Sequence, residues 1–406
     1  RMEFGFGMKM DSQDKLSFID AVGVLSATAI GGGILALPIA LYPFGVLGSA
    51  LFLTFVAFIN LSGGVLLAEA LMRTDHKIHL PSLMHHYFGR SGYVAVCISI
   101  MLHLYCALAA YIVAGGALVS SLSGGAIAQE VGAIVYFVIA SAIVLGGTKY
   151  VKGAEKIFAT IVVLLALIIS IFAFSNFTSQ KSPSAHWLAA LPAAFSVSLF
   201  AFLAHEIAPS VRIRMGDNWK GFLLALFFGT FIPAVLYICW TSAIIGAVPD
   251  GMLAEAGATG APATVPLAAV AGTVVLLLGS VFALFSTGSS YIGSAFALTD
   301  VFSDLSGEIG KRMDAKKAVA LTVLPPVVIA LFLPNSFVGL LEAAGIFGGC
   351  VLIGLMTPLV FLASRKYGKR KPEFAVPFPL GEFLAACLVA SALVMLLWEF
   401  FKLIGG

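Results

Sequence analysis

The sequence predicts an all-α polytopic membrane protein with eleven transmembrane helices, and three observations support this prediction. Of the 406 residues, 60% are hydrophobic and only 11% are charged, which is far from the composition of a soluble globular domain. The apolar residues form windows of about 20 or more, the length that crosses roughly 30 Å of hydrocarbon. Positive charge gathers in alternate loops between these windows.

Eleven apolar windows can be read along the chain, and we expect each to be one span. They cover residues 17–40, 44–72, 91–121, 129–148, 153–176, 189–214, 218–247, 266–302, 316–333, 336–363 and 379–402. The short polar runs between them leave no room for a soluble catalytic domain, so we do not expect an enzyme. The net charge of +3 reflects the loops and does not indicate nucleic-acid binding.

The positions of lysine and arginine predict the orientation. With eleven spans, all but Lys181 and Lys402 of the 23 positive residues fall on one face. Because cytoplasmic loops hold the excess of positive residues, this face is predicted to be cytoplasmic. We therefore expect a multi-pass protein of the plasma (inner) membrane, with its N-terminus in the cytoplasm and its C-terminus outside.

The first window contains its own helix breaker. Gly31, Gly32 and Gly33 are followed by Pro38. In lipid, irregular backbone is tolerated only where it is packed in protein or lines a polar cavity. Close helix packing is the ordinary explanation of a lone glycine, so this motif alone leaves both interpretations open.

The sixth window is interrupted in a different way. Its middle holds His205, Glu206 and Pro209 within an otherwise apolar run. Ionisable groups at that depth are costly and usually face a cavity or a partner. We therefore expect helices one and six both to be discontinuous.

The two interruptions occupy matching places in two blocks of similar length. A cytoplasmic segment, 1–16, precedes a first repeat of five spans, 17–176, and a second repeat, 189–363, follows, with the eleventh helix, 379–402, added. Five is an odd number, so the second repeat lies inverted relative to the first. Paired broken helices in inverted repeats point to a secondary transporter's binding site near the bilayer midplane.

The chemistry of two half-helix ends suits a zwitterion. A break exposes N–H groups that favour an anion and C=O groups that favour a cation. The carboxylate of an amino acid would take the N–H groups of Gly32 and Gly33, while its ammonium group would take carbonyls near Ala29 and from Phe200 to Ala204. Glycine lets a ligand reach the backbone because it has no Cβ.

Several motifs in order resemble one known family. They are "TAIGGGILALPIA", "YCALAAYIVAGGALV", "FLAHEIAPSV", "SSYIGSAFALTDVFSDL" and "LTVLPPVVIALFLPNSFVGLLEAAG". Together they cover spans one, three, six, eight and nine to ten, and they resemble the hydroxy and aromatic amino acid permeases, the tyrosine and tryptophan permease family. That family belongs with the amino acid/auxin permeases of the amino acid, polyamine and organocation superfamily.

The resemblance implies a LeuT-like fold of 5+5 inverted repeats and ion-coupled symport of neutral or aromatic amino acids (Tyr, Trp, Phe) by alternating access. A general neutral amino-acid Na⁺ symporter and an amino-acid sensor on the same scaffold remain alternatives. The partners expected are an amino-acid substrate and the lipid bilayer, with the protein a monomer. The substrate-binding residues that it implies are Ala29, Gly31, Gly32, Gly33, Tyr111, Phe200, Ala201, Phe202, Ala204 and His205.

The coupling ion is left open between H⁺ and Na⁺, and no other cofactor is expected. By resemblance, a Na⁺ site would use the carbonyls of Ala27 and Ile30 with the hydroxyls of Ser286, Ser289 and Ser290. These serines share one helical face, although such serines often bond to their own helix. The proton-coupling candidates are His205, Glu206 and Glu342.

Other polar residues receive plainer interpretations. The sequence "HEIAP" is not a zinc motif, because the second histidine of H-E-x-x-H would fall on Pro209. His103 is interpreted as a buried, hydrogen-bonded histidine. Glu69 is expected at a cytoplasmic helix end, where it either pairs with loop arginines or extends to the interface.

Overall fold

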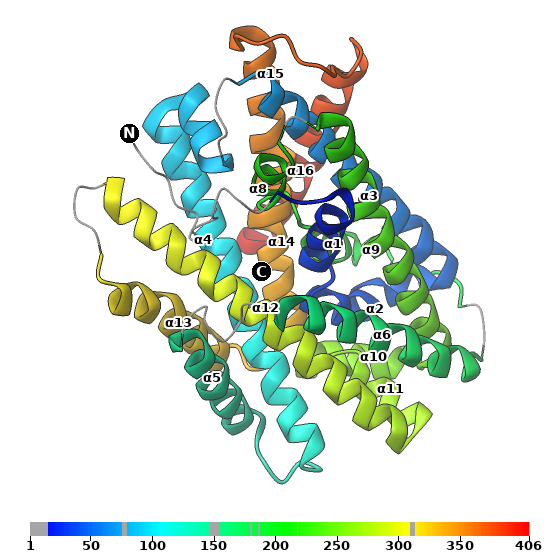
Figure 1. Cartoon of the computed structure of the whole chain (residues 1–406). Helices are drawn as coiled ribbons and strands as arrows, with labels where there is room; N and C mark the ends of the chain where they lie inside the picture. Colours follow the sequence, from blue (N-terminus) through cyan, green and yellow to red (C-terminus); the bar gives the residue numbers. More distant parts are fainter. Residues whose placement is uncertain are drawn as a thin grey trace.

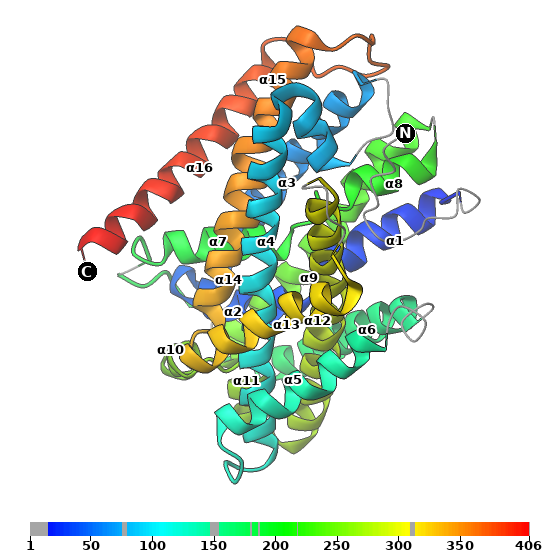
Figure 2. The same ribbon diagram turned by 90° about the vertical axis from the view of Figure 1, so that its left-hand side faces the viewer.

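The computed structural model describes residues 15–74, 79–146, 154–178, 181–185, 187–216, 218–308 and 313–405. Within these ranges the regular structure is entirely helical, and the helices form one bundle (Figures 1 and 2). Most of the predicted segment 1–16 lies outside the described residues, as do the loop lysines Lys77, Lys149 and Lys152.

The first predicted window is an interrupted helix. It holds three helical pieces: α1 (Phe18–Ala29), the 3-10 helix η1 (Gly32–Leu35) and α2 (Leu37–Leu41). Gly31 is extended, with φ −121° and ψ −158°, and separates α1 from η1. Pro38 stands in the first turn of α2, where its missing N–H costs no hydrogen bond. The interruption predicted from the triple glycine is present.

The sixth window is interrupted as well. It holds α7 (Leu191–Ala201) and α8 (Ala208–Met215). Residues 202–207 between them are not helical. Pro209 again lies at the start of the second piece. Both discontinuities therefore lie where the sequence places them.

The windows two to five and seven correspond to helices with similar bounds. They are α3 (Gly45–Met72), which follows η2 (Tyr42–Phe44), then α4 (Leu80–Leu122), α5 (Gln129–Leu145), α6 (Ala154–Ser175) and α9 (Trp219–Ala247). Helix α4 starts well before its predicted window because it includes a first segment that ends at Gly89. That glycine has φ 64°, which bends the chain in a way that other residues rarely allow.

The prediction that residues 266–302 form a single helix is wrong. The chain forms α11 (Thr264–Ala271) and α12 (Thr273–Glu308), after a helix α10 (Asp250–Thr259) that the sequence analysis did not predict. Gly272 separates α11 from α12 with φ 86°, a conformation that favours glycine. The apolar residues on both sides of Gly272 hide this turn from a hydropathy window.

The last three windows form the remaining helices. These are α13 (Ala315–Phe332), a continuous run of α14 (Phe337–Gly345), the π-helical segment η4 (Ile346–Met356) and α15 (Thr357–Tyr367), and finally α16 (Leu380–Gly405). Helix α4 packs against α5, α12 and α14, and α9 packs against α1 and α3. In Figure 2, α4 and α14 stand side by side in the middle of the bundle, with α16 slanting across one side.

The outer surface of the bundle is apolar, as lipid contact requires. Phe55, Ile139 and Phe231 are 53%, 60% and 50% exposed. The described residues contain seven helices long and apolar enough to cross a membrane, together with four shorter apolar helices. The chain is therefore a multi-pass helical membrane protein, while the number of eleven crossings stays a prediction.

A buried ionic cluster joins the ends of α3 and α15. The Glu69 side chain is fully buried and accepts hydrogen bonds from Arg73 Nη2 at 2.7 Å and from Arg365 Nε and Nη2 at 2.9 and 3.0 Å. The backbone N–H of Val376 donates to the same carboxylate at 2.8 Å, and Arg365 also donates to Glu382 of α16 at 2.5 Å. Two arginines and a backbone donor compensate the burial of this carboxylate. The predicted pairing of Glu69 with arginines is present.

Candidate functional site

The first interruption requires glycine because other parts of the protein touch its backbone. A Cβ atom on Gly32 would lie 2.4 Å from Cε1 of Tyr111, and one on Gly31 would lie 2.5 Å from Oγ of Ser290. The N–H of Gly32 donates to Ser290 Oγ at 3.0 Å. Tyr111 of α4 and Ser290 of α12 therefore both lie against the glycine backbone. Their roles in binding substrate and ion stay predictions.

The carbonyls released by the two breaks share one donor. Tyr237 Oη lies 2.5 Å from the carbonyl oxygen of Ala29 and 2.9 Å from that of Ala201. A phenol has a single proton, so Tyr237 donates to one carbonyl at a time or divides its hydrogen bond between them. One side chain of α9 thus bridges the ends of α1 and α7.

Trp240 lies one turn further along the same helix. Its indole N–H donates to the carbonyl of Ile34 at 2.9 Å. Trp240 and Tyr237 are both fully buried, and three residues of spacing place them on one face of α9. The sequence analysis missed both. The spacing could have identified them, because the two aromatic residues lie three positions apart in an apolar span. When buried, the O–H of tyrosine and the N–H of tryptophan usually find a hydrogen-bond partner.

The two interrupted helices meet at Gly33. A Cβ atom there would lie 3.1 Å from Cα of Ala201 and 3.1 Å from Cδ1 of Phe200. The structure therefore brings together most of the residues predicted to bind the substrate backbone: Ala29, Gly31, Gly32, Gly33, Tyr111, Phe200 and Ala201.

The remaining predicted binding residues lie further along the second break, and two of them, Phe202 and His205, contact α3. Asn60 Nδ2 donates to the carbonyl of Phe202 at 3.0 Å. The imidazole of His205 is buried against Gly63, where a Cβ atom would lie 2.9 Å from His205 Nε2. Ala204 is partly buried. This part of the break therefore packs on α3, and Asn60 is a polar contact that the sequence analysis did not single out.

Glu206 faces a histidine of α4. Its Oε1 lies 3.7 Å from Nε2 of His103. The Nδ1 of His103 lies 2.9 Å from the carbonyl of Ala344, and its ring centroid lies 5.5 Å from that of Phe200. The interpretation of His103 as a buried, hydrogen-bonded residue is confirmed. Its position opposite Glu206 was not predicted.

Glu342 is separate from this pair. Its carboxylate faces α16, where Lys402 Nζ lies 3.6 Å from Oε1. The structure therefore brings Glu206 and His205 to the second break but places Glu342 beside the end of the last helix.

The serines of α12 differ in what they contact. Ser290 accepts from Gly32, and Ser289 Oγ donates to the carbonyl of Ser286 at 3.3 Å. Ser286 is fully buried, and its Oγ has no hydrogen-bond partner among the described residues. Ser26 of α1 is in the same situation. An unpartnered hydroxyl on each helix fits the oxygen chemistry of a Na⁺ site between them.

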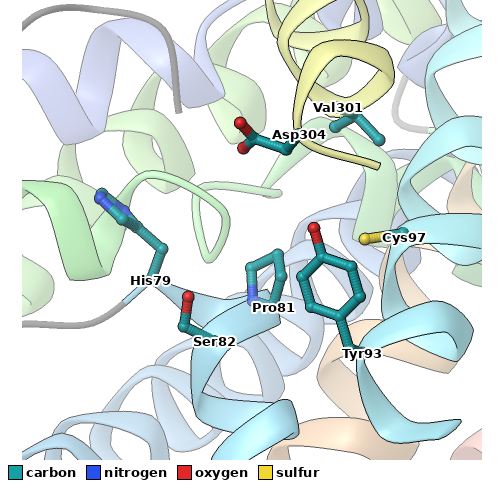
Figure 3. Close-up of a pocket in the computed structure, with 7 residues that line it drawn as sticks. All are labelled: His79, Pro81, Ser82, Tyr93, Cys97, Val301 and Asp304. Carbon is teal, nitrogen blue, oxygen red and sulfur yellow. The ribbon is translucent and has the colours of Figure 1, made fainter. Parts of the chain in front are cut away.

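A small recess, with room for about 10 Å³, lies elsewhere, between the start of α4 and the end of α12 (Figure 3). The residues lining it are His79, Pro81, Ser82, Tyr93, Cys97, Val301 and Asp304. Ser210 of α8 lies 3.0 Å from Nδ1 of His79. Burial lowers the pKa of His79 below its usual value, because an imidazolium would lose its hydration there. None of the predicted site residues lines this recess.

An apolar helical bundle in which two interrupted helices meet, with buried ionisable groups beside them, defines a membrane transporter of small solutes. Comparison with known proteins agrees, because the chain matches the model of the tryptophan/tyrosine permease family over residues 14–399. The chain belongs to this family. The prediction of an amino acid permease, and not an enzyme, is confirmed by this match.

Individual relatives match over nearly their whole length. The "Tyrosine-specific transport system 2" of Haemophilus influenzae is 28% identical, with 94% of this chain and 97% of the relative covered. The "Tryptophan-specific transport protein" of Shigella flexneri is 28% identical, with 96% and 97% covered. The "Tyrosine permease" of Enterobacter agglomerans is 25% identical, with 90% and 89% covered.

Proposed function

We propose that this protein is a secondary active transporter that carries aromatic amino acids, tyrosine and tryptophan first, together with a proton. It works by alternating access in the inner membrane, with two inverted five-helix repeats and an added eleventh helix, the N-terminus inside and the C-terminus outside. The observation that carries the proposal is the meeting of two interrupted helices at Gly33 and Ala201, together with family membership.

The hydrogen bonds at the breaks support a binding mode for the substrate backbone. The N–H of Gly32 is taken by Ser290, and the carbonyls of Ala29 and Ala201 are taken by Tyr237. An amino acid offers the same chemistry, since its carboxylate accepts N–H groups and its ammonium donates to carbonyls. The two hydroxyls therefore occupy, in this structure, the backbone groups that the substrate takes when it binds.

The substrate side chain is selected by the groups that surround the breaks. Tyr111 and Phe200 offer aromatic faces next to the glycine backbone, and Ala201 leaves room beside them. Aromatic rings pair favourably with such faces. The two relatives named for tyrosine-specific and tryptophan-specific transport agree with this choice.

Sodium coupling is the second candidate, because Ser26 and Ser286 each carry a buried hydroxyl without a partner among the described residues. Together with the carbonyls of Ala27 and Ile30, they offer a hard cation its preferred oxygen ligands. Proton coupling is supported instead by the buried His205 and the partly buried Glu206 at the second break.

Uptake into liposomes by the purified protein tests these proposals. Labelled tryptophan, tyrosine, alanine and glutamine are offered with a pH gradient or a Na⁺ gradient imposed separately. We expect tryptophan and tyrosine to accumulate when the pH gradient alone is imposed. Equal accumulation of alanine and glutamine would indicate the general neutral amino-acid transporter.

Ser286→Ala separates the two ions. If Na⁺ is the coupling ion, this variant needs a higher Na⁺ concentration for half-maximal uptake, whereas Ser170→Ala does not. Ser170 is a suitable control because it is buried and bonds only its own helix, to Ala166. We expect neither variant to show any dependence on Na⁺.

A further inference from the structure

We propose that His103 and Glu206 together bind the transported proton, as one site. This inference rests on the proposed proton symport and names the residues that perform it. Glu206 lies in the second break, and His103 lies on α4, 3.7 Å away between Oε1 and Nε2. That separation exceeds a hydrogen bond but lies within the range of an ion pair, so a small side-chain movement makes or breaks the contact.

The hydrogen bond on the other side of the imidazole fixes where the proton binds. A carbonyl oxygen only accepts, so the contact of 2.9 Å to Ala344 assigns a hydrogen to Nδ1 of His103. In the neutral ring Nε2 therefore has a free lone pair, and this atom faces Glu206. The Nδ1 hydrogen stays in place, while the transported proton enters and leaves between Nε2 and Oε1.

Burial makes the two groups depend on each other. The side chains of His103 and Glu206 are 6% and 20% exposed, and Oε1 of Glu206 has no hydrogen-bond partner among the described residues. An isolated carboxylate in such surroundings is costly, and a nearby cation offsets that cost. Without the transported proton the pair carries one negative charge, and with it the pair is neutral, as an imidazolium–carboxylate or an imidazole–carboxylic acid pair.

The contacts of His103 connect this pair to the substrate site and to the π-helical segment. Its ring lies against Phe200, with centroids 5.5 Å apart, and a Cβ on Gly348 would lie 2.4 Å from Nδ1. Phe200 in turn contacts Gly33 at the first break. A movement of His103 on proton binding is therefore transmitted both to the meeting point of the interrupted helices and to η4.

Other ionisable groups near this pair face elsewhere. His205 turns to Gly63 of α3, and Glu342 of α14 turns to Lys402 and Glu399 of α16. Cys350 on η4 is a buried thiol near Ser196. Glu206 is therefore the acidic group that the described structure places beside His103.

The test compares exchange with proton-driven accumulation in liposomes, using labelled tryptophan. Counterflow of labelled against unlabelled tryptophan at equal pH needs no net proton movement. An imposed gradient of two pH units drives a one-to-one symporter to about 100-fold accumulation. A pH-sensitive dye inside the liposomes reports the proton that enters with each substrate.

We expect Glu206→Gln and His103→Gln to keep counterflow while accumulation falls to about one and the dye signal disappears. Glu130→Gln and His86→Gln are matched controls, because both side chains are exposed, and they should accumulate tryptophan as the unmodified protein does. If one of the two variants does not fold, the other is sufficient for the test. His103→Gln with normal proton-driven accumulation would overturn the inference.

Two further outcomes separate this inference from the proposed function. If the unmodified protein exchanges tryptophan but ignores the pH gradient, the permease function stands, while proton coupling and this pair are both wrong. If Glu342→Gln loses accumulation while Glu206→Gln keeps it, proton symport stands and the proton site is not the pair named here. Absence of counterflow in the unmodified protein would overturn the proposed function itself.

Discussion

At each of the two interrupted helices, the break leaves backbone N–H and C=O groups without partners in their own helix, and the two breaks differ in the residues found there. The first break consists of glycine and small apolar residues, and its free backbone groups are met by side chains of other helices: Ser290, Tyr237 and Trp240. The second break carries its own ionisable side chains, His205 and Glu206, which turn towards α3 and α4.

This difference separates two tasks. A bare backbone offers fixed N–H and C=O groups, which suit the constant part of every amino acid. Titratable side chains exchange protons, which fixed amides do not. Under the proposed function, the first break therefore serves recognition and the second serves coupling. Gly33 lies against Ala201, where the two breaks meet.

The largest expected effect comes from adding side chains to the first break. Gly32→Leu abolishes transport without preventing membrane insertion, because its side chain would occupy the space of Tyr111. Gly32→Ala lowers uptake about 5- to 150-fold, as overpacking costs roughly 1–3 kcal/mol. Labelled tryptophan uptake measures both.

Gly23→Ala is the control for this prediction. Gly23 lies on α1, in the same predicted span as Gly32, but a Cβ there meets no atom within 4 Å, so uptake should be unchanged. Normal uptake by Gly32→Leu would show that the first break does not bind the substrate.

A smaller effect is expected from removing the hydroxyl that bridges the two breaks. In the substrate-free state of Tyr237→Phe, the carbonyls of Ala29 and Ala201 no longer receive a hydrogen bond from this hydroxyl. Because an ammonium group then supplies the missing hydrogen bonds, tryptophan should bind about 5- to 10-fold more tightly and leave more slowly. Equilibrium binding and counterflow rates measure the two effects.

Tyr105→Phe is the matched control, since its hydroxyl donates to the carbonyl of Leu321 on α13, away from both breaks. It should leave tryptophan affinity unchanged. Weaker binding by Tyr237→Phe would mean that this hydroxyl supports the bound state, and the two breaks would then not be joined by a group that the substrate displaces.

The smallest effect concerns the start of α8, directly after the second break, where Ser210 contacts His79. The pKa of His79 is lower in the folded protein than in the unfolded chain. The unfolded state therefore binds more protons, so stability falls as pH drops through about 6.5. His79→Asn removes this contribution. Between pH 7.5 and 5.5 the melting temperature of the variant should therefore fall less than that of the unmodified protein, and the two falls should differ by under about 2 °C. An identical pH dependence in the variant would contradict this prediction.

Both breaks could be predicted from the sequence because each is a local violation of a membrane rule. Three adjacent glycines, or two ionisable residues before a proline, stand out against apolar neighbours. Tyr111 could be named as a residue that covers the substrate through the family resemblance alone. The structure places its ring against Gly32, and its role towards the substrate stays a prediction.

The partners of the second break could not be predicted in this way. His103 bonds a residue 241 positions away and faces Glu206, and hydropathy gives the depth of a residue but not the helix that it faces. For the same reason Glu342 could be recognised as buried but not as a neighbour of α16. Gly272 was missed because a turn between two apolar helices leaves no polar signal.

The Glu69 cluster has a consequence for how the protein is made. Glu69 and Arg365 are 296 residues apart, so at about 5–20 residues per second synthesis brings Arg365 to the membrane roughly 15 to 60 s after Glu69. During that interval Arg73, four residues away on the same helix, is the cation that accompanies the carboxylate. The cluster is completed only when α15, the segment around Val376 and Glu382 of α16 have all been synthesised. The contact between the end of α3 and the last helices therefore forms late in synthesis.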